Sequence, residues 1–105
     1  MTREIESMLI DRFGRDSIIA LATVDQGSPC VRNVDAYYDC GCFYVLTHAQ
    51  SGKMRQIAQN PSVAVSGDWF TGHGIGENLG HVLLKIRLTD GVLFASGTRY
   101  DIDFT

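Results

Sequence analysis

The residues best suited to do chemistry in this sequence are Ser51, Gly52 and Lys53, which stand together between a strand-like segment and a helical pattern. The first amides of a helix have no partner within it and the helix dipole favours an anion, so this junction suits a phosphate group. Arg32, expected on the neighbouring strand, can offer the same phosphate two hydrogen bonds. Spacing alone favours a plainer interpretation, in which Ser51 caps the helix and Lys53 is solvated.

Other patterns that often carry chemistry are weaker here. The glycines at 72, 74 and 76 lack the spacing of a dinucleotide fingerprint, and Gly52-Lys53 lacks the upstream glycine of a P-loop. Cys30, Cys40 and Cys42 are odd in number and lack the spacing of structural zinc ligands. We therefore expect free thiols, no metal site and no nucleophile–base pair.

The first half of the chain predicts a helix followed by three strands. Apolar residues recur at helical spacing over 3–13, and Gly14 stands where a left-handed helix cap is common. This helix is expected to lie on a barrel as a lid. Strand-like segments cover 17–25, 29–38 and 42–47, with short turns between them. Together these three segments predict a meander.

The second half alternates a helix with further strands. Helical spacing covers 51–60 before a proline, and strand patterns cover 62–70, 81–88 and 92–96. The Thr89-Asp90-Gly91 tripeptide is a hairpin signal. The glycine-rich stretch 71–80 predicts an exposed loop or an interface arm, and the strand-rich pattern closes most economically as a barrel.

Composition limits the class of protein. The 105 residues allow one core, so we expect a single domain over 1–105. A net charge of −3 gives no basic surface for nucleic acid or anionic lipid, and no apolar run is long enough to cross a bilayer. The polar amino terminus does not resemble a signal peptide, which indicates the cytoplasm.

Five segments stand in a distinctive order and spacing: Ile19–Asp25, Val31–Val34, Phe43–Thr47, Ser51–Ile57 and Asn60–Val65. In this order they resemble the FMN-binding split-barrel proteins related to pyridoxamine 5′-phosphate oxidase. The stretch Asp68–Val82 is also similar to a subgroup described as general-stress or nitroimidazole-resistance-related. The resemblance implies a mainly β protein with short helices, folded as a split β-barrel that binds FMN.

The resemblance also implies which residues touch the cofactor. One strand would lie beside the flavin ring and ribityl chain, an adjoining strand would add a contact, and the start of the second helix would hold the phosphate. In this order the residues are Arg32, Asn33, Val34, Asp35 and Tyr37, then Leu46 and Thr47, then Ser51, Gly52 and Lys53. In this family the flavin lies between two subunits, so Trp69 would cover the partner's flavin.

The implied function is an FMN-dependent oxidoreductase that takes hydride from a nicotinamide donor and reduces a small electron-poor acceptor. The alternatives are a flavin-binding stress-response module with little turnover and a haem-binding split barrel. Val63, Val65, Trp69 and Phe70 suggest an apolar face that a second copy covers in a homodimer. Relatives with a comparable 76–81 segment usually carry a further helical stretch before the closing strands, so the chain is either shortened here or given without those residues. The true vitamin B6 oxidases use an arginine-containing segment at the carboxy terminus for substrate; its absence from this sequence disfavours oxidation of pyridoxamine phosphate.

Overall fold

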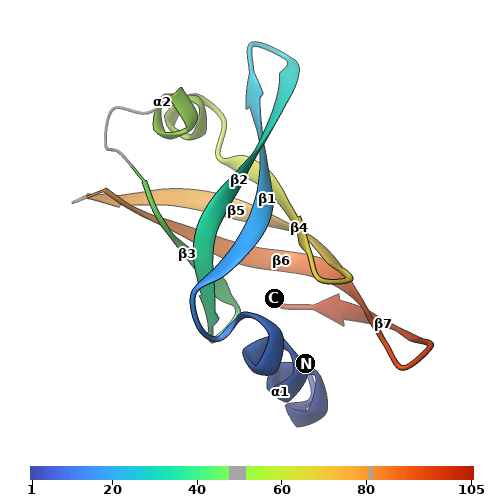
Figure 1. Cartoon of the computed structure of the whole chain (residues 1–105). Coiled ribbons are helices and arrows are strands. Elements are labelled where there is room, and N and C mark those ends of the chain that lie inside the picture. The colour runs from blue at the N-terminus through green and yellow to red at the C-terminus, as the bar shows by residue number, and fades with distance from the viewer. Residues whose placement is uncertain (48–51, 81) are drawn as a thin grey trace.

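Most of the chain forms β-strands, as Figure 1 shows for the computed structural model, which describes residues 1–47, 52–80 and 82–105. In chain order the elements are α1 Arg3–Phe13, β1 Ser17–Asp25, β2 Ser28–Asp39, β3 Cys42–Leu46, α2 Gly52–Gln59, β4 Ser62–Gly67, β5 Phe70–Gly80, β6 Leu83–Ala95 and β7 Thr98–Asp103. The two helices and the meander β1–β2–β3 agree with the prediction. Neither helix is long and apolar enough to cross a membrane.

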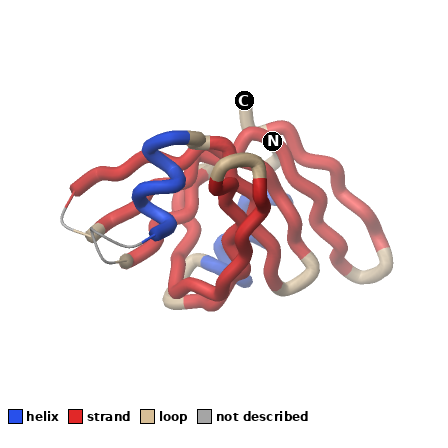
Figure 2. Tube along the Cα trace, turned by 90° about the horizontal axis from the view of Figure 1, so that it is seen from above, coloured by secondary structure: helices blue, strands red, loops and turns tan. Residues whose placement is uncertain are grey.

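The strands close into a barrel. Neighbours follow the order β3–β2–β1–β4–β5–β6–β7, and β3 also pairs with β6, so that the first six strands form a ring. All of these pairings are antiparallel. Figure 2 shows α2 lying beside the ring of strands, and Figure 1 places α1 at the opposite end. The predicted split-barrel fold is confirmed.

Helix α1 seals one end of the barrel. Its residues Ile5, Leu9 and Phe13 are buried, and the Phe13 ring lies 5.4 Å from that of Phe43 and 6.0 Å from that of Phe70, measured between centroids. Edge-to-face contacts of this kind add to the free energy gained from burial alone. The expected lid is therefore an integral part of the core.

The end of α1 differs from the prediction in one detail. Gly14 does follow the helix, but its φ is −73°, so it is not a left-handed cap. A Cβ atom at this position would lie 2.5 Å from the carbonyl oxygen of Ile10. Glycine is needed here because the chain passes too close to the helix for any side chain.

The glycine-rich segment is a strand, so its prediction as a loop was wrong. In β5, Gly72, Gly74 and Gly76 face the barrel interior, where a Cβ would come within 2.8–2.9 Å of neighbouring atoms. The ring of Phe70 takes up the space beside Gly72, and Ile57 takes up the space beside Gly76. The glycines thus leave room for large side chains of other elements inside a narrow barrel.

The predicted hairpin at 89–91 was also wrong, because β6 runs through it without a break. Opposite it, the register of β5 and β6 shifts between His73 and Gly74, which leaves Thr89 as an extra residue in a β-bulge. Asp90 accepts a 2.8 Å contact from the His73 ring, and the Thr89 hydroxyl donates to the His73 carbonyl. The true hairpin follows β6, where Ser96 and Gly97 have positive φ angles, and leads into β7, which the sequence did not predict.

Candidate functional site

The barrel is split between β2 and β3. These strands pair only from Asp39–Cys42 to Ala36–Val45, whereas β3 pairs with β6 along its whole length on its other edge. Just after β3, the backbone amide of Thr47 donates to the Val82 carbonyl oxygen at 2.7 Å, so the chain stays beside β6 and not beside β2. Within the described residues, the edge of β2 that faces β3 over 33–35 therefore lacks a strand partner. Such an edge offers backbone donors and acceptors to a ligand.

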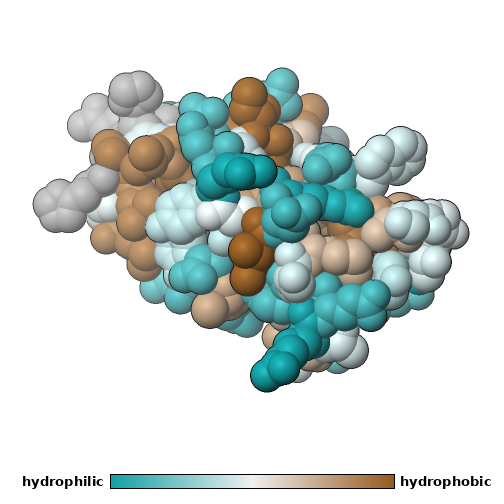
Figure 3. All heavy atoms as spheres, turned by 60° about the horizontal axis from the view of Figure 1, so that its bottom comes forward, coloured by the Kyte–Doolittle hydropathy of each residue, from teal (hydrophilic) through white to brown (hydrophobic). Residues whose placement is uncertain are grey.

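A cavity of about 440 Å³ occupies this split. It is lined by Asn33, Val34, Asp35, Leu46, Thr47, Lys53 and Val82, so six of the seven lining residues are ones that the sequence singled out. Its rim is partly apolar, since Leu46 is 69% and Val82 is 39% exposed. Figure 3 shows hydrophobic surface, in brown, gathered at this end of the molecule. The volume falls within the range of about 300–1,000 Å³ that is usual for ligand sites.

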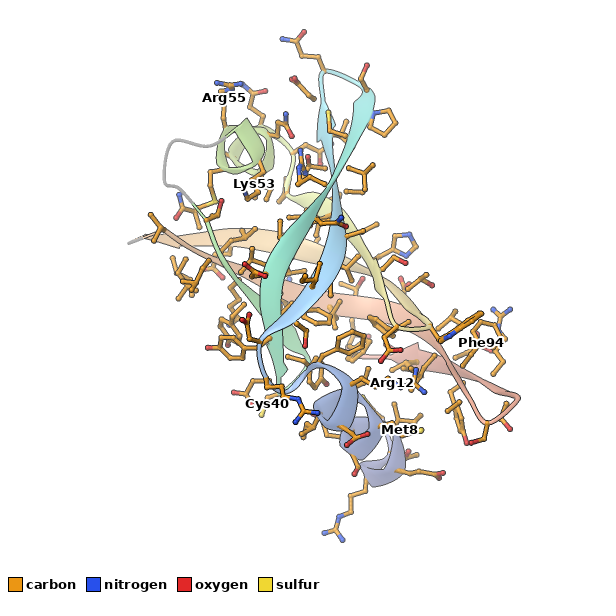
Figure 4. The ribbon with its side chains drawn as sticks, in the orientation of Figure 1. Met8, Arg12, Cys40, Lys53, Arg55 and Phe94 are labelled. Atoms are coloured by element: carbon orange, nitrogen blue, oxygen red, sulfur yellow. The ribbon has the colours of Figure 1, made fainter. Side chains whose placement is uncertain are left out.

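Lys53 supplies a positive charge to the cavity. It belongs to the first turn of α2, and Figure 4 shows it extending toward the barrel, whereas Arg55 on the same helix points away. Partial burial lowers the pKa of Lys53, and the positive charge of Arg32 lowers it further. Both effects disfavour the charged lysine when no anion is near. An anion bound in the cavity would reverse them.

Arg32 lies on β2 but does not line the cavity. Its Nη1 donates to the Thr23 hydroxyl at 2.8 Å and to the Leu21 carbonyl oxygen at 3.3 Å, while its Nη2 donates to the amide oxygen of Gln56 at 3.1 Å. Thr23 and Gln56 are both buried and hydrogen-bonded to each other. Neither was predicted, although a polar residue at 56, between the apolar Met54 and Ile57 of the helix, was a usable signal.

Among the described residues, three predicted site residues besides Arg32 lie outside the cavity lining. Tyr37 is half exposed and stacks on Tyr44 of β3, with ring centroids 5.3 Å apart. Gly52 is the exposed first residue of α2, and Ser51 falls outside the described residues. Trp69 sits in the β4–β5 turn, 76% exposed and with a positive φ of 63°. Its predicted contact with a partner's flavin stays a prediction.

A second hollow lies on the outer face of the sheet. It has a volume of about 270 Å³. Its lining includes Ala20, Ala22, Val31, Ala64 and Val92, from β1, β2, β4 and β6, with the His73–Asp90 pair also in the lining. The apolar face that the sequence suggested is wrong for three of its four residues: Val63, Val65 and Phe70 are buried, whereas Trp69 is exposed.

The cysteines are free thiols. Cys40 occupies the β2–β3 turn, where a hydrogen bond to Asp39 and the charge of that carboxylate raise the pKa of the thiol. A raised pKa leaves less of the nucleophilic thiolate at neutral pH. Over residues 1–47, 52–80 and 82–105, no three histidine, cysteine or acidic side chains are grouped as metal ligands.

Comparison with known protein families agrees with this geometry. The family model described as pyridoxamine 5′-phosphate oxidase matches residues 3–98. The chain belongs to this family. The match includes every residue that lines the β2–β3 cavity and both side chains that accept hydrogen bonds from Arg32. No protein of curated function matches the sequence.

Solved structures share the fold of this member of the pyridoxamine 5′-phosphate oxidase family. General stress protein 26 from Bacillus anthracis str. Sterne has a TM-score of 0.75 at 17% identity, covering 94% of this chain and 99% of that one. A FAD-binding protein from Mesorhizobium loti has a TM-score of 0.69 at 13% identity, covering 87% and 92%. A haem-binding protein from Mycobacterium smegmatis has a TM-score of 0.70 at 12% identity, covering 91% and 55%. At such identities these likenesses establish the fold alone.

Proposed function

We propose that this protein binds FMN in the β2–β3 cavity and uses it as an oxidoreductase, taking hydride from a nicotinamide donor to reduce a small electron-poor acceptor. The observation that carries the proposal is the cavity itself: an unpaired backbone edge, a partly apolar rim and a cation meet there. Membership of the pyridoxamine 5′-phosphate oxidase family supports a flavin, and the FAD-binding relative agrees. A location in the cytoplasm is also part of this proposal.

The residues present fit the parts of FMN. A flavin ring has an apolar benzenoid end and a pyrimidine edge that donates and accepts hydrogen bonds; Leu46 and Val82 suit the first, and the backbone of 33–35 suits the second. Lys53 suits the phosphate. Asp35 carries the opposite charge in the same cavity, so the phosphate belongs at the α2 end, away from that carboxylate.

This assignment asks little chemistry of the side chains. Bound FMN would accept and release the electrons, while the protein positions the ring and holds the phosphate. The backbone of β2 would orient the pyrimidine edge, and Lys53 with Arg32 would supply the positive charge. A flavin-binding module with little turnover uses the same contacts, so the two functions differ in reactivity rather than in binding.

Anaerobic mixing with NADH or NADPH is expected to bleach the absorbance of the bound flavin, and a nitroaromatic or a quinone should restore it. Stopped-flow absorbance of the purified protein measures both half-reactions. Tight FMN binding without reduction at a useful rate would favour the stress-response module. A Soret band in the purified protein, in place of a flavin spectrum, would favour haem instead, as in the Mycobacterium smegmatis relative.

The FMN-loaded protein is expected to be a homodimer. Three apolar side chains are strongly exposed: Ile18 at 69%, Val31 at 71% and Trp69 at 76%. Val31 also lines the outer hollow, and apolar surface of this kind is typically covered by a partner. Light scattering should give twice the 11.6 kDa mass of one chain. A monomer at micromolar concentration would contradict the proposed assembly, and Val31→Asp should weaken the dimer while leaving the barrel folded.

A further inference from the structure

The environment of Arg32 suggests how its charge is used. A guanidinium has five N–H donors, and the structure accounts for three of them: two on Nη1, toward Thr23 and Leu21, and one on Nη2, toward Gln56. The remaining donors are the second N–H of Nη2 and that of Nε. No described residue accepts from either. In a guanidinium, Nε–H and the N–H of Nη2 beside it lie parallel along one edge, which is the geometry that binds two oxygens of a phosphate.

The groups that hold Arg32 are all neutral. They are a hydroxyl, a carboxamide oxygen and a backbone carbonyl, whereas the ion pairs among the described residues lie elsewhere, at His73–Asp90 and Arg99–Asp101. Thr23 is 1% exposed and Gln56 is 8% exposed, so these side chains are fixed by packing as well as by their mutual hydrogen bond. A glutamate at position 56 could accept the same hydrogen bond but would neutralise the guanidinium.

We propose that Thr23 and Gln56 are positioning residues that form a neutral seat for Arg32, fixing its guanidinium while leaving its charge for the phosphate of the ligand. The seat makes the site select a phosphorylated flavin over an unphosphorylated one. This inference rests on the proposed function, since it assumes that the phosphate of FMN is the anion. It adds two buried residues, from β1 and α2, that set the specificity of that site.

The test compares FMN with riboflavin, which differ by the phosphate alone. The phosphate preference is defined as the Kd of riboflavin divided by the Kd of FMN, with both constants measured by quenching of flavin fluorescence. Gln56→Glu is expected to lower this preference by about tenfold or more, since the charge-assisted contact is lost. Gln59→Glu adds the same charge on an exposed position of the same helix and should lower it by less than about threefold.

Thr23 gives a second, independent pair of variants. Thr23→Val removes the hydroxyl without changing the shape of the side chain and should also lower the phosphate preference. Thr23→Ser keeps the hydroxyl and should keep the native preference. A merely structural role would weaken both ligands together and leave their ratio unchanged. Circular dichroism identifies any variant that does not fold. If one pair of variants fails to fold, the other pair still tests the proposal.

The outcomes distinguish failure of the neutral seat from failure of the proposed FMN binding. If Arg32→Ala lowers the phosphate preference but Gln56→Glu and Thr23→Val do not, the neutral seat is wrong and FMN binding stands. If Arg32→Ala weakens FMN and riboflavin equally, the arginine supports the strand and the seat has no role in specificity. If the native protein binds neither flavin, the proposed function fails and this inference fails with it.

Discussion

Replacing Lys53 by alanine is expected to weaken FMN binding about 10- to 150-fold, and riboflavin binding by less than about threefold. The side chain lines the β2–β3 cavity, where burial and the nearby charge of Arg32 already lower its pKa. The positive charges of Lys53 and Arg32 therefore repel each other when no anion is bound. Because only FMN brings that anion, the loss should fall on FMN. Fluorescence titration of both ligands measures it.

Arg55→Ala provides the matched control for this experiment. Arg55 is also a cation on α2, but it is exposed and points away from the barrel (Figure 4). Removing it lowers the net charge by the same amount, so any long-range effect should appear equally in both variants. Lys53→Arg should keep most of the affinity for FMN. Equal losses of FMN and riboflavin in Lys53→Ala would remove Lys53 from the phosphate site.

The sequence predicted the cavity better than it predicted the environment of Arg32. The residues on β2 and β3, and Lys53 at the start of α2, form one lining because the order of segments fixes which strands are neighbours. The contacts of Arg32 depend on Thr23 and Gln56, which are 33 positions apart in the sequence. Period and spacing report local structure, and a long-range hydrogen-bond network leaves no local signal beyond an isolated buried polar residue.

The fold was predicted where local propensity and tertiary packing agree, as in α1 and the β1–β2–β3 meander. It was missed where they conflict. Glycine weakens a strand by its propensity, yet the interior of a closed barrel has no room for a Cβ beside Phe70 or Ile86, so β5 needs glycine on its inner face. Similarly, Gly91 belongs to a continuous strand because the Phe70 ring lies against it, although Asp-Gly usually marks a turn.

This explanation of β5 predicts that Gly74→Ala will destabilise the protein by about 1–3 kcal/mol, even though alanine is the better residue by strand propensity. The added Cβ would lie 2.8 Å from the carbonyl oxygen of Arg87 and 2.8 Å from a methyl carbon of Ile86. The carbonyl belongs to the backbone of the paired strand β6, so relief requires the two strands to move apart. The midpoint of urea unfolding, at fixed protein concentration and without flavin, measures the change.

Gly52→Ala separates this steric effect from the general effect of losing a glycine. Gly52 begins α2, and a Cβ there would meet nothing closer than 3.9 Å, so alanine should leave stability unchanged or raise it by up to about 1 kcal/mol. The two variants make the same chemical change, but only Gly74→Ala should lower the midpoint. If Gly74→Ala is as stable as the native protein, the interior of the barrel has room to spare, and the glycines of β5 require another explanation.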